Sequence, residues 1–165
     1  MKGIHNMVAA AVAIAALLIA APLQAQEKQQ RPAQLSKQIV ADKKMHRLIL
    51  QVNTNEPPVM NLVLNNATNV AQYYQDLGEK VTIEIVTFGP GLHMLCDDTS
   101  PVKARIKAIS ESTPTISFKA CGNTRENMGK AESKEIALIA EAKVVKSGVV
   151  RVMELQEKGW TYVKP

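Results

Sequence analysis

Apolar residues recur along the chain in two patterns that alternate. Short runs rich in apolar, β-branched and aromatic residues predict strands at residues 46–52, 81–88, 115–118 and 143–145, and a short last strand at 160–163. Between these runs, apolar residues at helical spacing predict helices that begin near Pro57, Pro101 and Ser147. Two further short helices are expected at 124–128 and 131–140. Strands that alternate with helices predict an α/β sandwich with a mainly parallel sheet and right-handed crossovers.

The first 25 residues have the pattern of a secretory signal peptide. Lys2 precedes an unbroken apolar run at residues 7–21, and Ala25 supplies the small residue that a signal peptidase needs. The alternative is a membrane anchor, but the run is shorter than the roughly 20 residues that span a bilayer. We therefore expect cleavage after Ala25, a polar extension at 26–45, a single domain at 46–165, and no membrane contact after cleavage.

Charge and composition argue against nucleic-acid binding. The 165-residue chain carries a formal net charge of +5, and removing Lys2 leaves 19 basic and 15 acidic residues, a net charge of +4. The lysines are scattered, and aromatic residues make up only 4 % of the chain, which leaves little for base stacking. The charge is instead typical of a soluble protein with some attraction for anions.

Candidate chemistry gathers at residues 117–126, where a strand, a sharp turn and a helix follow one another. Gly122 permits the turn, and Asn123 with Glu126 has the spacing of a capping box. Cys121 therefore lies just before a helix N-terminus, where unpaired N–H groups and the helix dipole favour thiolate over thiol. The alternative is a small buried hydrophobic residue, which most cysteines are.

Three loops are expected to converge on Cys121. In parallel sheets, ligands gather at the carboxyl ends of the strands, where the segments 53–55, 89–96 and 121–125 all lie. The residues expected to support Cys121 are Asn53, Gly89, Gly91, His93, Cys96, Lys119, Gly122, Asn123, Thr124 and Arg125. Among them, Lys119 and Arg125 add positive charge, and His93 is a candidate proton shuttle.

We expect neither a cofactor nor a metal. The two glycines around Pro90 lack the spacing of a phosphate-binding motif. His93, Cys96 and Cys121 offer too few ligands of matching spacing for a convincing zinc site. The two cysteines of an exported protein also suit a reversible disulfide, and the sequence leaves their separation open.

The chain resembles the DsrE/DsrF-like sulfur-relay family. The resemblance is carried by the segments 48–53, 64–67, 85–92, 118–124 (Phe-Lys-Ala-Cys-Gly-Asn-Thr) and 149–162, and it extends from about residue 46 to the C-terminus. It implies a three-layer α/β/α fold with a mostly parallel sheet of about five strands, and assembly into trimers or hexamers. It also implies that Cys121, after the third strand, carries sulfur as a persulfide.

The chain departs from the family in two respects. It has the pattern of an exported, periplasmic protein, whereas family members of established function are cytoplasmic, and Cys96 has no counterpart in the relay motif. Three functions remain open: a sulfur carrier or sulfurtransferase that uses Cys121 with a donor or acceptor protein or small thiol, an oligomeric binding protein without turnover, and a redox protein that uses both cysteines.

Overall fold

Five parallel strands form one sheet in the order β4-β3-β2-β1-β5. The structure is a computed structural model that describes residues 45–165, so the expected signal peptide and nearly all of the polar extension lie outside the described residues. The predicted α/β sandwich is confirmed, and every strand pairing is parallel. The elements are β1 (Met45–Val52), α2 (Pro57–Asp76), β2 (Lys80–Thr87), η1 (a 3₁₀ helix, Gly89–Leu95), α3 (Lys103–Ser112), β3 (Ile116–Cys121), α4 (Gly122–Glu132), β4 (Ala142–Val145), α5 (Gly148–Glu157) and β5 (Thr161–Val163).

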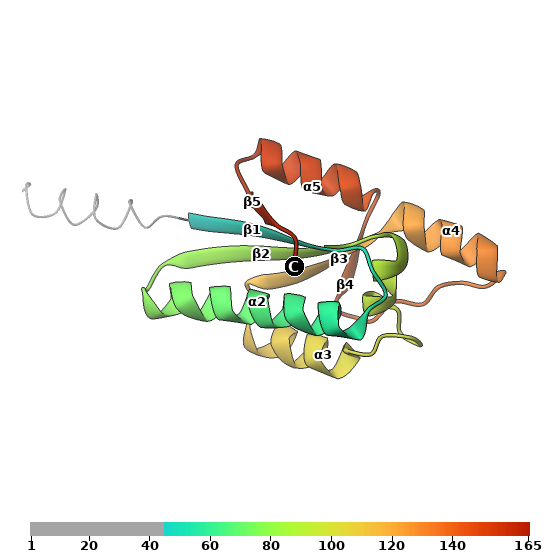
Figure 1. Cartoon of the computed structure of the whole chain (residues 1–165), viewed down its shortest axis with the longest axis horizontal. Coiled ribbons are helices and arrows are strands. Elements are labelled where there is room, and N and C mark those ends of the chain that lie inside the picture. The colour runs from blue at the N-terminus through green and yellow to red at the C-terminus, as the bar shows by residue number, and fades with distance from the viewer. Residues whose placement is uncertain (1–44) are drawn as a thin grey trace, which may run out of the picture. The chain divides into compact units, whose positions relative to one another are not determined.

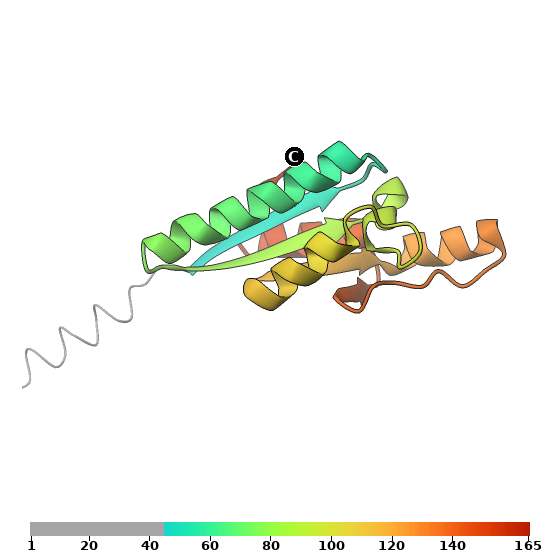
Figure 2. The ribbon, with the colours of Figure 1, turned by 90° about the horizontal axis from the view of Figure 1, so that it is seen from below.

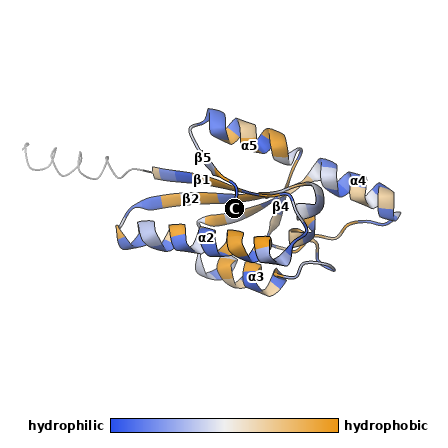
Figure 3. Cartoon of the chain, in the orientation of Figure 1, coloured by the Kyte–Doolittle hydropathy of each residue, from blue (hydrophilic) through white to orange (hydrophobic). Residues whose placement is uncertain are grey.

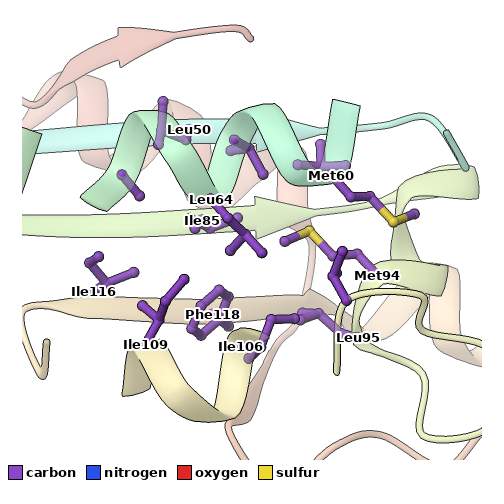
Figure 4. Packing of buried hydrophobic residues seen from close by; sticks show 14 of the residues in the cluster. Leu50, Met60, Leu64, Ile85, Met94, Leu95, Ile106, Ile109, Ile116 and Phe118 are labelled. Carbon is purple, nitrogen blue, oxygen red and sulfur yellow. The ribbon is translucent and has the colours of Figure 1, made fainter. Parts of the chain in front are cut away.

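Helices α2 and α3 cover one face of the sheet and bury the larger core (Figures 1 and 2). The alternate strand residues that face these helices are apolar, including Leu50 of β1, Ile85 of β2 and Phe118 of β3. Figure 4 shows these side chains packing against Met60 and Leu64 of α2. Helix α2 begins at two prolines, which suit a first helical turn, and is followed by Gly78 with a φ of 65°.

Helix α5 lies on the opposite face, so the three layers expected from the resemblance are present (Figure 1). Its core is smaller and consists of Ile49, Val86, Val152 and Leu155. As the sequence predicts, Ser147 caps α5 by accepting a hydrogen bond from the Val150 N–H. Glu84 of β2 is buried on this face, where Arg151 of α5 binds it. The α5 face is therefore the more polar side of the sheet.

The segment after β3 differs from the prediction of two short helices. A single helix, α4, extends over Gly122–Glu132 without burying any residue, and Figure 3 colours it mainly blue and pale. Ser133 then adopts a left-handed conformation with a φ of 50° and ends the helix. The predicted helix at 131–140 is wrong, because residues 134–141 form an irregular segment that pairs with the end of η1 and the residues after it: Ile139 N–H donates to the Leu95 carbonyl over 3.0 Å, and Leu138 bridges to Cys96. Ile136 and Ile139 are buried through this pairing.

Candidate functional site at Cys121

Cys121 is the last residue of β3 and also the N-cap of α4. The predicted capping box is therefore wrong: the cap is Cys121 and not Asn123, and Glu126 pairs with Lys130 instead. The sulfur takes the place of a cap oxygen. The Cys121 side chain forms no cap hydrogen bond, but the N–H groups of Asn123 and Thr124 stabilise the thiolate and so lower the pKa of the thiol.

The Cys121 side chain is directed toward α5. Phe118 and Ala120 face the larger core, and strand alternation places Cys121 on the other side of the sheet. A Cβ built on Gly148, the first residue of α5, would lie 3.3 Å from the Cys121 Cβ and 2.9 Å from Phe88 Cδ1. The absence of a side chain at Gly148 therefore allows the N-terminus of α5 to approach the thiol. Two helix N-termini, those of α4 and α5, converge on one sulfur.

Thr124 links the thiol to the loop after β2. Its Oγ1 accepts a 3.0 Å hydrogen bond from the Gly89 N–H, which leaves the hydroxyl proton available, and the Thr124 hydroxyl lowers the pKa of the Cys121 thiol. Gly89 has a φ of 54°, a conformation that glycine adopts without strain. The loops after β2 and β3 are thus joined at the site, as the sequence predicts.

The pKa of the Cys121 thiol is lowered from its ordinary value. Burial raises it, since the residue is only 4 % exposed. The hydroxyl of Thr124 and then the N–H groups of Gly148, Thr124 and Asn123 lower it by more in total. Asn123 contributes least, in keeping with its N–H already donating to the Lys146 carbonyl over 3.2 Å. The donors therefore shift the equilibrium of the Cys121 thiol toward the thiolate, which is the nucleophilic form of cysteine.

The loop after β1 supports this edge of the sheet through close backbone packing. A Cβ on Gly91 would lie 2.2 Å from the Val52 carbonyl oxygen and 2.8 Å from the Asn53 N, so only glycine fits there. A Cβ on Gly122 would lie 3.1 Å from the Val145 carbonyl oxygen. Asn53, Gly91 and Gly122 act here through their backbones and not through side chains.

The two expected cations have different environments. Lys119 lies two residues before Cys121 on the same strand face, and Glu84, Lys143 and Arg151 are its charged neighbours. Arg125 instead turns toward the segment after α4: its Nε donates to the Ile136 carbonyl over 2.7 Å, and its Nη2 binds Glu135 over 3.0 Å. Of these two residues, Lys119 shares the sheet face of Cys121 and Arg125 does not.

Cys96 and His93 form a separate group. Cys96 belongs to the core on the α2 and α3 face, and its thiol donates to the Leu92 carbonyl over 3.4 Å. His93 Nδ1 is hydrogen-bonded to Thr99 Oγ1 over 2.8 Å, and the Thr99 side chain also contacts Cys96. Both cysteines are free thiols. The structure brings His93 together with Cys96 and does not bring either of them to Cys121.

The turn between β4 and α5 is the part of the site that the sequence analysis missed. Gly148 was not among the expected residues, although it supplies an N–H to the sulfur. The sequence does contain a signal for a helix N-terminus at this position, because Ser147 predicts a helix start directly after a strand. What the sequence does not reveal is that β4 lies beside β3, with Cys121 paired to Val145.

A cavity of about 450 Å³ lies elsewhere, between α2 and the β1–β5 edge of the sheet. Its lining includes His46, Leu48, Tyr73 and Thr161. These residues lie toward the amino ends of the strands and on the α2 side, whereas Cys121 ends β3 and faces α5. The cavity is thus no part of the Cys121 site.

Within residues 45–165, no group of three or more His, Cys, Asp or Glu side chains has an arrangement that would hold a metal ion. Over the same part of the chain, no helix combines the length and the apolar character needed to cross a membrane.

The fold has a counterpart among solved structures. The chain is similar to a protein of unknown function, MTH1491 from Methanobacterium thermoautotrophicum, with a TM-score of 0.61 and 26 % sequence identity. The match covers 73 % of this chain and 99 % of MTH1491. The two share a three-layer α/β/α fold. No protein-family model and no curated protein matches the chain.

Proposed function

We propose that this protein is a sulfur carrier of the sulfurtransferase type, which holds sulfane sulfur as a persulfide on Cys121. The observation that supports the proposal is the position of the Cys121 thiol, where two helix N-termini and the Thr124 hydroxyl lower its pKa despite burial. A carrier needs a thiolate to accept sulfur and a protected place to hold it, and this position offers both.

The reaction has two transfers. The Cys121 thiolate attacks the outer sulfur of a donor persulfide, the donor S–S bond breaks, and the donor leaves as a thiolate with the electron pair. An acceptor thiolate then attacks the outer sulfur of the Cys121 persulfide and releases the Cys121 thiolate. Both transfers conserve charge and need neither oxidant nor cofactor. The N–H groups of Gly148 and Thr124 stabilise the Cys121 thiolate before the first transfer and after the second.

The resemblance to the sulfur-relay family supports this proposal and the assembly into trimers or hexamers, and the signal-peptide pattern of residues 1–25 supports the location. We propose that the mature protein acts in the periplasm after cleavage behind Ala25, and assembles as a trimer or hexamer. Its partners are then sulfur donors and acceptors, either proteins or small thiols, and not nucleic acid. A redox pair is less well supported, because the two thiols face opposite sides of the sheet.

A binding protein without turnover is the second candidate, and the low exposure of Cys121 favours it. In that case the same position serves to pack the loops together and the thiol does not react. The two functions differ in whether Cys121 accepts sulfur.

Intact mass after incubation with a sulfane-sulfur donor separates the candidates. We expect a gain of about 32 Da per sulfur, removed by reductant and mapped to Cys121. Cys121→Ser should abolish the gain, while Cys96→Ser, the matched control at the other buried thiol, should retain it. Loading that survives Cys121→Ser contradicts the carrier function, and no gain with any donor leaves the binding protein as the better explanation.

A further inference from the structure

Two lysines lie side by side on the α5 face of the sheet. Lys119 of β3 and Lys143 of β4 are direct partners in the parallel register. Lys119 is half-buried and Lys143 is exposed. Like charges at adjacent positions of neighbouring strands destabilise a sheet. A negative charge near the pair would therefore stabilise it.

The protein does not supply that charge within residues 45–165. Glu84 is the carboxylate nearest to Lys119, and Arg151 already binds both of its oxygens, over 3.0 and 2.6 Å. Neither lysine forms a salt bridge in this part of the chain. Burial lowers the pKa of Lys119, Glu84 opposes this effect, and Lys143 and Arg151 lower the pKa further. This strip of the sheet therefore carries a net positive charge.

The lysine pair lies beside the reactive thiol. Lys119 and Cys121 are two residues apart on the same strand face, a spacing of roughly 7 Å along a strand. The N–H groups at the starts of α4 and α5 lie at the Cys121 end of this strip. A small anion bound by the lysines would thus lie on the same face of the sheet as the sulfur, about two strand residues from it.

We infer that the Lys119–Lys143 pair is an anion site that selects small, doubly charged sulfane-sulfur donors for Cys121, the class to which inorganic thiosulfate belongs. This inference rests on the proposed sulfur-carrier function. The Cys121 thiolate attacks the outer sulfur of thiosulfate, the S–S bond breaks, and sulfite leaves with the electron pair. Cys121 becomes a persulfide anion, so atoms and charge balance without an oxidant or a proton. Lys119 and Lys143 bind the sulfonate oxygens and stabilise the charge that collects on sulfite.

Two measurements test the inference. The first is the rate at which thiosulfate loads Cys121 with sulfur, followed by intact mass. The second is the ratio of the Cys121 modification rates by anionic sulfonatoethyl and cationic aminoethyl methanethiosulfonate, which react alike but differ in charge. Lys119→Met with Lys143→Gln removes both charges and keeps the volume of the half-buried side chain. Lys80→Gln with Lys107→Gln is the matched control, because it removes two exposed charges at the start of β2 and on α3.

We expect the Lys119 and Lys143 variant to lower both the thiosulfate rate and the anion-to-cation ratio by roughly tenfold at low salt, with the control close to the unsubstituted protein. The single Lys143→Gln variant, at an exposed position, should show a smaller loss of the same kind. Persulfide loading at an unchanged rate and ratio overturns the anion site and leaves the carrier function standing. A fall in the ratio without persulfide on Cys121 from any donor supports the anion site and refutes the carrier function.

Discussion

The two cysteines are both buried, yet the pKa of one thiol is raised above its ordinary value and that of the other is lowered. Cys96 is 1 % exposed and Cys121 is 4 % exposed. Burial raises the pKa of Cys96. The Thr99 hydrogen bond and Lys134 lower it, whereas Asp98 and Glu132 raise it, and the pKa remains above its ordinary value. Burial also raises the pKa of Cys121, but its hydrogen-bond donors reverse the shift. Burial alone therefore does not set the direction of the pKa shift; the hydrogen-bond donors near the sulfur do.

The largest expected difference is in alkylation. With iodoacetamide at about pH 7, Cys121 should react at least about tenfold faster than Cys96 in the native protein, because a larger fraction of it is thiolate. Peptide mapping by mass spectrometry gives both rates in one sample. In concentrated urea the two rates should become similar, which is the internal control. Equal rates in the native protein would contradict the contrast between the two thiols.

Thr124→Val should produce the next largest effect. The change removes the hydroxyl that lowers the pKa of Cys121 most, so the midpoint of its alkylation rate against pH should move upward. It also leaves the Gly89 N–H without its acceptor, which should cost about 1–3 kcal/mol of unfolding free energy.

Thr124→Ser retains the hydroxyl and is the matched control for this prediction. It should keep the midpoint close to that of the unsubstituted protein. The alkylation rate of Cys96 should be unchanged in both variants. An unmoved Cys121 midpoint in Thr124→Val would show that the helix N-termini alone set the pKa.

Gly148→Ala should act on the same thiol through packing. The added methyl would meet Phe88 at 2.9 Å, so the start of α5 must shift away from the sulfur. We expect a loss of about 1–3 kcal/mol in unfolding free energy and a smaller rise in the Cys121 pKa. Val149→Ala, at the exposed next position of α5, should leave the Cys121 pKa unchanged. A Gly148→Ala variant with unchanged Cys121 reactivity would exclude the α5 N-terminus from the site.

The sequence predicts the sheet well because each strand contains β-branched or aromatic residues in a pattern that suits a strand. It also places Cys121 correctly between a strand and a helix, since strand, turn and helix follow in ten residues around it. Prediction from the sequence fails where contacts with other segments of the fold determine the local structure. Ile136 and Ile139 have a spacing compatible with a helix, but pairing with the end of η1 holds them in an irregular segment. Arg125 lies next to the site in sequence, yet the Ile136 carbonyl and Glu135 turn it away.

Gly148 illustrates a different limit. Its own sequence context predicts a helix start correctly, but its role depends on which strand lies beside β3. Strand order is a property of the assembled sheet, and local patterns do not contain it. Residues that act through backbone N–H groups are harder still to identify, because no side-chain chemistry marks them.

The smallest expected effect is on stability against pH, and here the two thiols should have opposite signs. The folded pKa of Cys121 lies below the ordinary value of 9.0, so its stabilising contribution is complete above about pH 9 and is lost as pH falls through the folded pKa. The folded pKa of Cys96 lies above 9.0, so its contribution is complete below about pH 9 and is lost as pH rises through the folded pKa. Urea unfolding of Cys121→Ala and Cys96→Ala between about pH 6 and 10 isolates the pH-dependent contribution of each thiol. The stability deficit of Cys121→Ala should grow as pH rises toward 9, and that of Cys96→Ala should shrink above 9. Parallel pH curves for the two variants would mean that both thiols ionise in the same environment, against the distinction on which the site rests.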